Sequence, residues 1–162
     1  MKLPLEGLTM ALNSGAMVVD DGATTFDIAT AVNFALDGAA YLKATVSNGA
    51  TPTSDGTTGA AFVPVLPDQA CVFVFALNAT GTVSLHQADS VTVDADSDVL
   101  DVAAQLPLID LNTYCPIAYV LYQTAGTSAA VGLKPGTDNW NATGLTSTVV
   151  DLIVYPSRPV AA

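Results

Sequence analysis

Charged side chains are scarce in this 162-residue chain. They make up 12% of the residues, against roughly 25% in an average soluble domain. Only four are cations (Lys2, Lys43, Lys134 and Arg158), and fifteen acids bring the formal net charge to −11. Four cations cannot neutralise a run of phosphates, so we expect the chain to bind neither nucleic acid nor an anionic membrane surface.

Long apolar runs are also missing. No uninterrupted apolar stretch approaches the roughly 20 residues that a membrane-spanning helix needs. Glu6 and Asn13 interrupt the apolar stretch at residues 3–19. We therefore expect no secretory signal in that segment.

Cysteine is rare, since Cys71 and Cys115 are the only two and each lies in a strongly apolar segment. We interpret them as buried, reduced thiols that pack as small hydrophobic side chains. The sequence leaves open a disulfide between neighbouring strands. Neither a CxxC pair nor a Cys/His cluster is present, so we expect no zinc site.

Helical periodicity is absent as well, apart from a turn or two at residues 98–105. Fourteen of the fifteen acids are Asp, which favours turns, and only Glu6 is the better helix former. Strand signals recur every 8–12 residues or so, between Gly, Pro and Asp turns. The chain is therefore predicted to be all-β, with a single-domain antiparallel β-sandwich or barrel-like fold at residues 22–162 and residues 1–21 as an N-terminal arm. Strands are expected at residues 9–12, 17–19, 25–28, 33–36, 41–46, 70–77, 82–87, 91–93, 116–122 and 149–154, and Pro64 makes residues 62–66 an edge strand or an irregular one.

Residues 70–77, ACVFVFAL, are consecutive apolar residues rich in β-branched and aromatic types. This run predicts a central strand buried on both faces, paired in a hairpin with residues 82–87. Asp37-Gly38 predicts a second hairpin, because both residues can take positive φ. Residues 48–59 are rich in Gly, Thr and Ser and are predicted to form an exposed loop.

The acidic run DADSDVLD at residues 94–101 resembles the start of a calcium loop, with Asp94, Asp96, Asp98 and Asp101 as oxygen donors. Its sixth position is Val99, where the loop needs Gly, and its twelfth is Gln105, where the loop needs Glu. We interpret the run as a solvated acidic turn, and a looser calcium site stays as the alternative.

His86 is the only histidine, and it falls on the polar side of its alternating strand. A Ser–His–Asp triad would have to use it, yet no GxSxG or other nucleophile signature accompanies it. No dinucleotide or Walker motif is present. We therefore predict no catalytic residues, no cofactor-binding residues and no metal ligands.

Trp140 lies in a polar, turn-like segment. An exposed Trp could stack on a sugar or anchor an interface, and the interpretation we favour is a Trp that caps one end of the core. The sequons Asn78-Ala79-Thr80 and Asn141-Ala142-Thr143 are interpreted as turns.

From Phe62 onward the chain resembles small structural proteins of tailed bacteriophages that are encoded near capsid genes. Three segments carry the resemblance: QACVFVFALNATGTVSLHQAD as a central hairpin, LPLIDLNTYCPIAYVLYQT as a Pro-rich crossing with a Cys-Pro-led strand, and GTDNWNATGLTSTVVDL as a C-terminal loop with Trp and a final strand. The chain has Ala118 where such proteins often have Gly in the strand after Cys-Pro.

The resemblance implies a virion protein without enzymatic activity: a capsid decoration or cement protein that binds the major capsid protein on the outer capsid surface and stabilises the head. It also implies a homotrimer, because decoration proteins commonly occupy three-fold positions of the shell. The low charge and a mean hydropathy of +0.47 leave two alternatives: a surface unusually rich in Thr, Ser and small apolar residues, or apolar surface that is buried between subunits. A host-surface or glycan-binding module of a tail or fibre is the alternative, and a virion glycan hydrolase is the third hypothesis.

Overall fold

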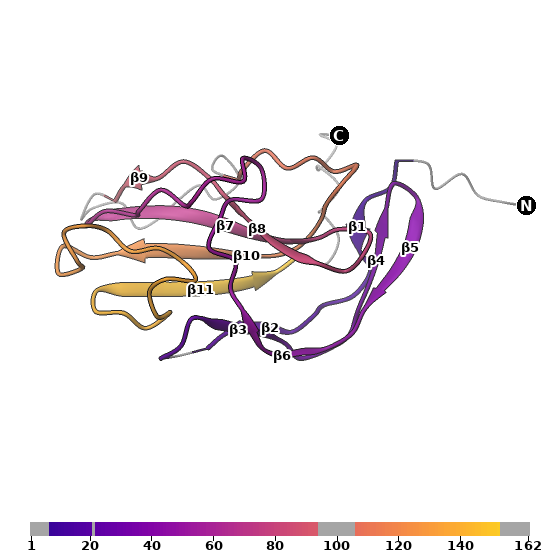
Figure 1. Cartoon of the computed structure of the whole chain (residues 1–162), viewed down its shortest axis with the longest axis horizontal. Coiled ribbons are helices and arrows are strands. Elements are labelled where there is room, and N and C mark those ends of the chain that lie inside the picture. Colours follow the sequence, from indigo (N-terminus) through magenta and orange to yellow (C-terminus); the bar gives the residue numbers. More distant parts are fainter. Residues whose placement is uncertain (1–6, 21, 94–105, 153–162) are drawn as a thin grey trace, which may run out of the picture.

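The computed structural model describes residues 7–20, 22–93 and 106–152, and these residues form an all-β fold without a helix. Their strands make three antiparallel sheets, none of which closes into a barrel, so the all-β, sandwich-like prediction is confirmed (Figure 1). The strands are β1 (Met10–Ala11), β2 (Met17–Val19), β3 (Thr25–Ile28), β4 (Val32–Leu36), β5 (Ala39–Lys43), β6 (Val46–Ala50), β7 (Gln69–Leu77), β8 (Val83–Gln87), β9 (Val91–Thr92), β10 (Cys115–Thr124) and β11 (Leu145–Asp151).

The large sheet has the strand order β11-β10-β7-β8, and β9 pairs with the start of β7. β7 is central, and every residue from Ala70 to Leu77 is buried, as predicted. The alternation of its side chains gives the sheet two faces. Phe73 and Phe75 point to the inner face, where the main core lies, and Val72 and Val74 point to the outer face, where a smaller cluster lies.

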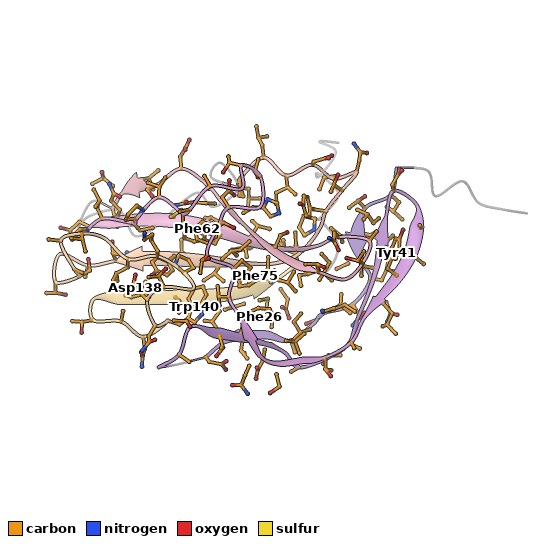
Figure 2. All side chains as sticks on the ribbon, viewed as in Figure 1. Phe26, Tyr41, Phe62, Phe75, Asp138 and Trp140 are labelled. Atoms are coloured by element: carbon orange, nitrogen blue, oxygen red, sulfur yellow. The ribbon has the colours of Figure 1, made fainter. Side chains whose placement is uncertain are left out.

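Two three-stranded sheets cover the inner face: β1-β4-β5 and β2-β3-β6. Phe26 of β3 packs against Phe75 with ring centroids 5.2 Å apart. Phe34 of β4 stacks on Tyr41 of β5 at 5.4 Å. Figure 2 shows Phe26, Phe75 and Trp140 together in the interior between the layers, with Tyr41 in the sheet at the far end. The Phe26–Phe75 contact joins two sheets that share no backbone ladder, whereas Phe34 and Tyr41 are paired within one sheet.

Both predicted hairpins form. The first turn has the positive φ angles that its residues allow, and the second is stabilised by side-chain hydrogen bonds. Asp37 and Gly38 have φ of 47° and 78°, as a two-residue turn between β4 and β5 requires. At the β7–β8 turn, the Asn78 side-chain oxygen accepts hydrogen bonds from the backbone N–H groups of Thr80 and Thr82, at 3.0 and 2.9 Å. The first sequon is therefore a structural turn.

The prediction of an exposed loop at residues 48–59 is wrong in two places. Residues 46–50 form β6, which pairs with β3, and Gly49 sits so close to Phe26 that an added Cβ would lie 2.9 Å from the ring. Thr51 and Asp55 are buried. The polar composition of residues 48–59 is typical of a loop, but two features there depend on partners elsewhere in the chain. The small residues of β6 fit against the Phe26 ring, and hydrogen-bond donors surround the Asp55 carboxylate.

The last strand begins earlier than predicted. The sequence predicts a strand at residues 149–154, whereas β11 starts at Leu145 and pairs with β10 without interruption to Asp151. In β11, half-buried Ser147 and Val149 alternate with exposed Thr146 and Thr148, as in a strand with one buried face. The sequence does not show this alternation, because the residues of both faces include polar ones. At the other end of the chain, β1 and β2 fall inside the segment 1–21 and pair with β4 and β3.

Candidate functional site

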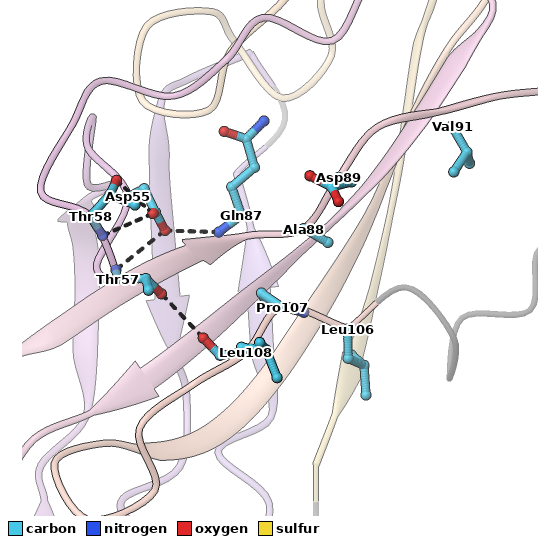
Figure 3. Close-up of a pocket in the computed structure, with 10 residues that line it drawn as sticks. All are labelled: Asp55, Thr57, Thr58, Gln87, Ala88, Asp89, Val91, Leu106, Pro107 and Leu108. Carbon is cyan, nitrogen blue, oxygen red and sulfur yellow. Dashed lines mark hydrogen bonds between the residues drawn. The ribbon is translucent and has the colours of Figure 1, made fainter.

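A cleft of about 500 Å³ lies between the segment 55–58, the end of β8 and the segment 106–108. Asp55 and Asp89 line it together with Leu106, Pro107 and Leu108 (Figure 3). A second hollow of about 590 Å³ shares Asp55 and Asp89 and continues along residues 60–66. The two hollows make this side of the molecule its candidate functional region.

Asp55 is the most strongly held carboxylate of the cleft. Its oxygens accept hydrogen bonds from the backbone N–H groups of Thr57 (3.3 Å), Thr58 (3.0 Å) and Gln87 (3.1 Å), and from the Thr58 hydroxyl (2.8 Å). Burial alone would raise its pKa, but these donors, the Thr58 hydroxyl first, bring the pKa below the usual 3.8. Asp55 is thus an ionised anchor for its loop and for the edge of β8, with its oxygens already engaged.

His86 is fully buried, although it lies on the polar side of β8 as predicted. Its Nε2 is 2.9 Å from the Ser84 hydroxyl and its Nδ1 is 3.0 Å from the Thr57 hydroxyl, while Tyr114 packs edge-on against the ring. Gly56 lies over the imidazole so closely that an added Cβ would be 2.7 Å from Cε1. Burial lowers the pKa of His86, and the charge of Asp55 only partly opposes this.

The His86 geometry differs from that of a catalytic triad. A serine is within hydrogen-bond distance of the imidazole, but the group at Nδ1 is the Thr57 hydroxyl, in the position where a triad holds a carboxylate. The ring is also sealed from solvent. Ser84, His86 and Thr57 therefore form a buried polar network, and Thr57 extends it by donating to the carbonyl oxygen of Leu108 at 3.3 Å.

An uncharged, apolar surface borders the second hollow. Val63, Leu66 and Val131 are 66%, 44% and 80% exposed. A two-bond backbone bridge between Val65 and Leu133 holds their two segments together. No ionisable side chain occurs at residues 56–67 or 125–133. We call this surface the apolar face; it consists of Ala60, Ala61, Val63, Pro64 and Leu66, which line the hollow, and of the exposed residues Ala129, Ala130 and Val131, whose segment the bridge holds beside them.

The cysteines behave as predicted. Both are buried and free, so no disulfide forms between them. In the β7–β10 ladder Cys71 is opposite Tyr122 and Cys115 is opposite Leu77, which places the thiols at opposite ends of the pairing. Burial raises the pKa of Cys71 to about 11 and that of Cys115 to about 12, so neither is a thiolate at neutral pH.

Trp140 caps the core and offers no stacking platform. It is 1% exposed, and its ring packs edge-on against Tyr122 with centroids 5.8 Å apart. Its backbone N–H donates to Ala23, which ties the segment before β11 to the β2–β3 turn. The core-cap interpretation is confirmed, and the interpretation of Trp140 as an exposed sugar-binding residue is wrong.

Among the described residues, no group of three or more His, Cys, Asp or Glu side chains is arranged to hold a metal ion. The acidic run at residues 94–101, where the looser calcium site was considered, lies outside the described residues. No helix long and apolar enough to cross a membrane occurs in the described part of the chain.

Sequence reasoning missed Asp55 and the apolar face. The Asp55-Gly56-Thr57-Thr58 run has the composition of an Asx turn, a signal that could have indicated a side-chain anchor. Its bond to Gln87 joins residues far apart in the chain and has no local signature. Comparisons with protein-family models, curated proteins and solved structures give no match to this chain.

Proposed function

We propose that the chain is a structural protein of a tailed-phage virion, a decoration or cement protein that binds the major capsid protein on the outside of the head and stabilises the shell. The three segments that resemble such proteins become neighbours in the fold. They supply the β7–β8 hairpin, then the crossing with β10, and then the Trp140 segment with β11. Together they make up one continuous sheet, so the residues that carry the resemblance belong to a single structural unit.

The apolar face is the observation that carries the proposal. On a chain of net charge −11, Val63, Leu66 and Val131 are exposed within segments that have no charge at all. Contiguous exposed apolar surface on a soluble protein marks an interaction site. A cement protein needs such a surface, because it contributes to the shell only through the area that it buries.

The proposed role is non-enzymatic. His86 is sealed from solvent, the oxygens of Asp55 are engaged, and both thiols are buried. These four side chains thus serve packing and loop anchoring. The proposal requires no cofactor, nucleic acid or membrane, and it places the protein on the capsid surface as an oligomer.

A glycan-binding module of a tail or fibre has less support. That hypothesis relied chiefly on an exposed Trp140, which is buried. The Asn- and Thr-rich loops alone do not provide the aromatic surface on which sugar rings usually stack.

The test is co-sedimentation of the purified chain with expanded phage heads that lack it. Val131→Asp places a charge in the apolar face at a site that is 80% exposed, so the fold should tolerate it. Leu42→Asp, at a site 66% exposed on β5, is the matched control. We expect the wild type and Leu42→Asp to bind the heads and raise their resistance to heat, and Val131→Asp to lose both effects. Failure of the wild type to bind, or equal binding by Val131→Asp, would refute the proposal.

A further inference from the structure

β11 is an edge strand of the large sheet and differs from the other described edges. It pairs with β10 over seven consecutive residues without a bulge. From Leu145 to Val150 it contains no proline and no charged residue. Sheet edges of soluble proteins are usually kept short, bulged, charged or covered, because an open edge is a template for another strand.

The other described edges carry such protection. The edge of β8 is covered by the Asp55 loop, where Gly56 N–H donates to the carbonyl oxygen of Leu85 at 2.8 Å. The β3–β6 ladder contains a register shift, and β5 ends in Lys43. β1, β2 and β9 have two or three residues each.

The ladder to β10 shows which backbone groups of β11 remain on the open side. Leu152 N–H donates to the carbonyl oxygen of Ile117, and Ala125 N–H donates to that of Gly144. Hydrogen-bonded pairs alternate along an antiparallel ladder, so residues 146, 148 and 150 bond to β10. The N–H and C=O groups of Ser147 and Val149 therefore point away from the sheet, and within the described part of the chain they have no hydrogen-bond partner.

We propose that β11 pairs antiparallel with β11 of a second copy of this chain, about a two-fold axis at Thr148. In this register Ser147 lies opposite Val149 of the second copy, and the four open backbone groups of each strand are used in the two hydrogen-bonded pairs. Thr148 meets its own counterpart, and Thr146 meets Val150. These are exposed, β-branched side chains at the closely spaced positions, a favourable cross-strand combination.

The absence of charge on β11 permits a second copy as the partner, and the two-fold register that uses all four open backbone groups favours it. A chain of net charge −11 repels its own copies, and the contact has to be free of carboxylates to form. Residues 145–150 meet that condition. The only acid of the strand is Asp151, whose carboxylate accepts hydrogen bonds from Ser14 and from the backbone N–H of Met17. The contact would join two large sheets into one, and the resulting dimer would replace the trimer that the resemblance implied.

The oligomeric state of the full chain in solution tests the pairing without any capsid. Light scattering across a concentration series should give a mass approaching twice 16.5 kDa. Thr148→Lys places two cations opposite each other in the dimer and should raise the dimer dissociation constant by about tenfold or more. Thr92→Lys, at an exposed strand residue of the same sheet, is the matched control and should leave the mass unchanged. A wild-type monomer or trimer, or a dimer insensitive to Thr148→Lys, would overturn the proposal.

Cysteine cross-linking tests the register. At a two-fold non-hydrogen-bonded pair the Cα atoms are about 4.5 Å apart, within reach of a disulfide. Under oxidation, Thr148→Cys should form a covalent dimer and Thr146→Cys should not, because Thr146 faces Val150 of the second copy. Cross-linking at 146, or none at 148, would show that β11 does not pair in this way. Neither experiment depends on head binding, so the two proposals can fail separately.

Discussion

The two faces of the large sheet are covered in different ways. On the inner face, Phe73 packs edge-on against Phe62 at 5.3 Å and against Tyr122 at 5.5 Å, and Phe75 meets Phe26 of the opposite sheet. Almost all of this contact is apolar. Since hydrophobic stabilisation follows buried area, the larger cluster on the inner face contributes more to the folding free energy than the smaller cluster on the outer face.

On the outer face, the smaller cluster around Val72 and Val74 is covered by partly buried residues, including Leu106 and Ile109, from a segment without regular secondary structure. Two contacts tie that segment to the rest of the outer face: the Thr57 hydroxyl donates to the carbonyl oxygen of Leu108, and the Tyr114 ring packs edge-on against His86. The fold thus depends on a large apolar cluster on the inner face, and on a smaller apolar cluster together with the polar network around His86 on the outer face.

The largest expected effect comes from neighbouring residues of β7 that face opposite sides. Phe75→Ala should reduce the free energy of unfolding by about 3–5 kcal/mol, because it empties a fully buried ring site. Val74→Ala, on the outer face, should cost about 1–2 kcal/mol for the smaller volume removed. Urea unfolding of the three proteins gives both values. Equal losses at the two positions would contradict the asymmetry between the faces.

Asp55→Asn probes the polar anchor at the edge of β8. One carboxylate oxygen becomes an NH₂ group that faces N–H donors, so we expect a loss of roughly 1–3 kcal/mol in unfolding free energy. Asp89→Asn, at an exposed residue of the same cleft, should stay within about 0.5 kcal/mol of the wild type. A loss below that limit at Asp55 would mean that the anchor contributes little.

Stability should depend on pH through His86. Its pKa is lowered in the folded protein relative to the ordinary 6.5, so the unfolded chain binds the proton more readily. The contribution of the neutral ring is complete above pH 6.5 and is lost as the pH falls below it toward the folded pKa, with a slope of at most about 1.4 kcal/mol per pH unit.

His86→Gln should remove this slope, since glutamine can bond Thr57 and Ser84 without titrating. The pKa of Asp55 is lowered below 3.8 in the folded protein, so we expect a separate loss of stability at lower pH, where that carboxylate becomes protonated. Urea unfolding at a series of pH values separates the two. A slope near pH 6 that survives in His86→Gln would assign the effect to another group.

Removal of metal ions should have no effect on the thermal stability of the protein. The acidic run at residues 94–101 lacks the glycine and the terminal carboxylate of a calcium loop. We therefore expect the same melting temperature with and without EDTA. A drop that calcium restores would contradict our interpretation of that run.

Local patterns predicted much of the fold. The structures of the apolar run at residues 70–77 and of the Asp37-Gly38 turn are determined by residues that are adjacent in the sequence, and both form as expected. β6 and the start of β11 were missed because their residues are polar or small and are stabilised by distant partners. The clearest example is Gly49, whose fit against Phe26 cannot be read from the residues around it.

The candidate site was harder to predict than the fold. His86 was expected on the polar side of β8, but its burial depends on Gly56 and Tyr114, which are remote from it in the sequence. The apolar face is assembled from two segments that are far apart in the sequence and are joined by the Val65–Leu133 bridge. Surfaces of this kind have no sequence motif, because they are defined by what is left exposed once the chain has folded.

Immunogold labelling of virions tests the central claim most directly. Antibody against the purified chain should be applied to intact virions of the virus that carries its coding sequence, with virions lacking the gene as the control. The account predicts label over the whole outer surface of the head, and none on heads without the gene. Label confined to the tail or fibres, or absent from virions altogether, would contradict it.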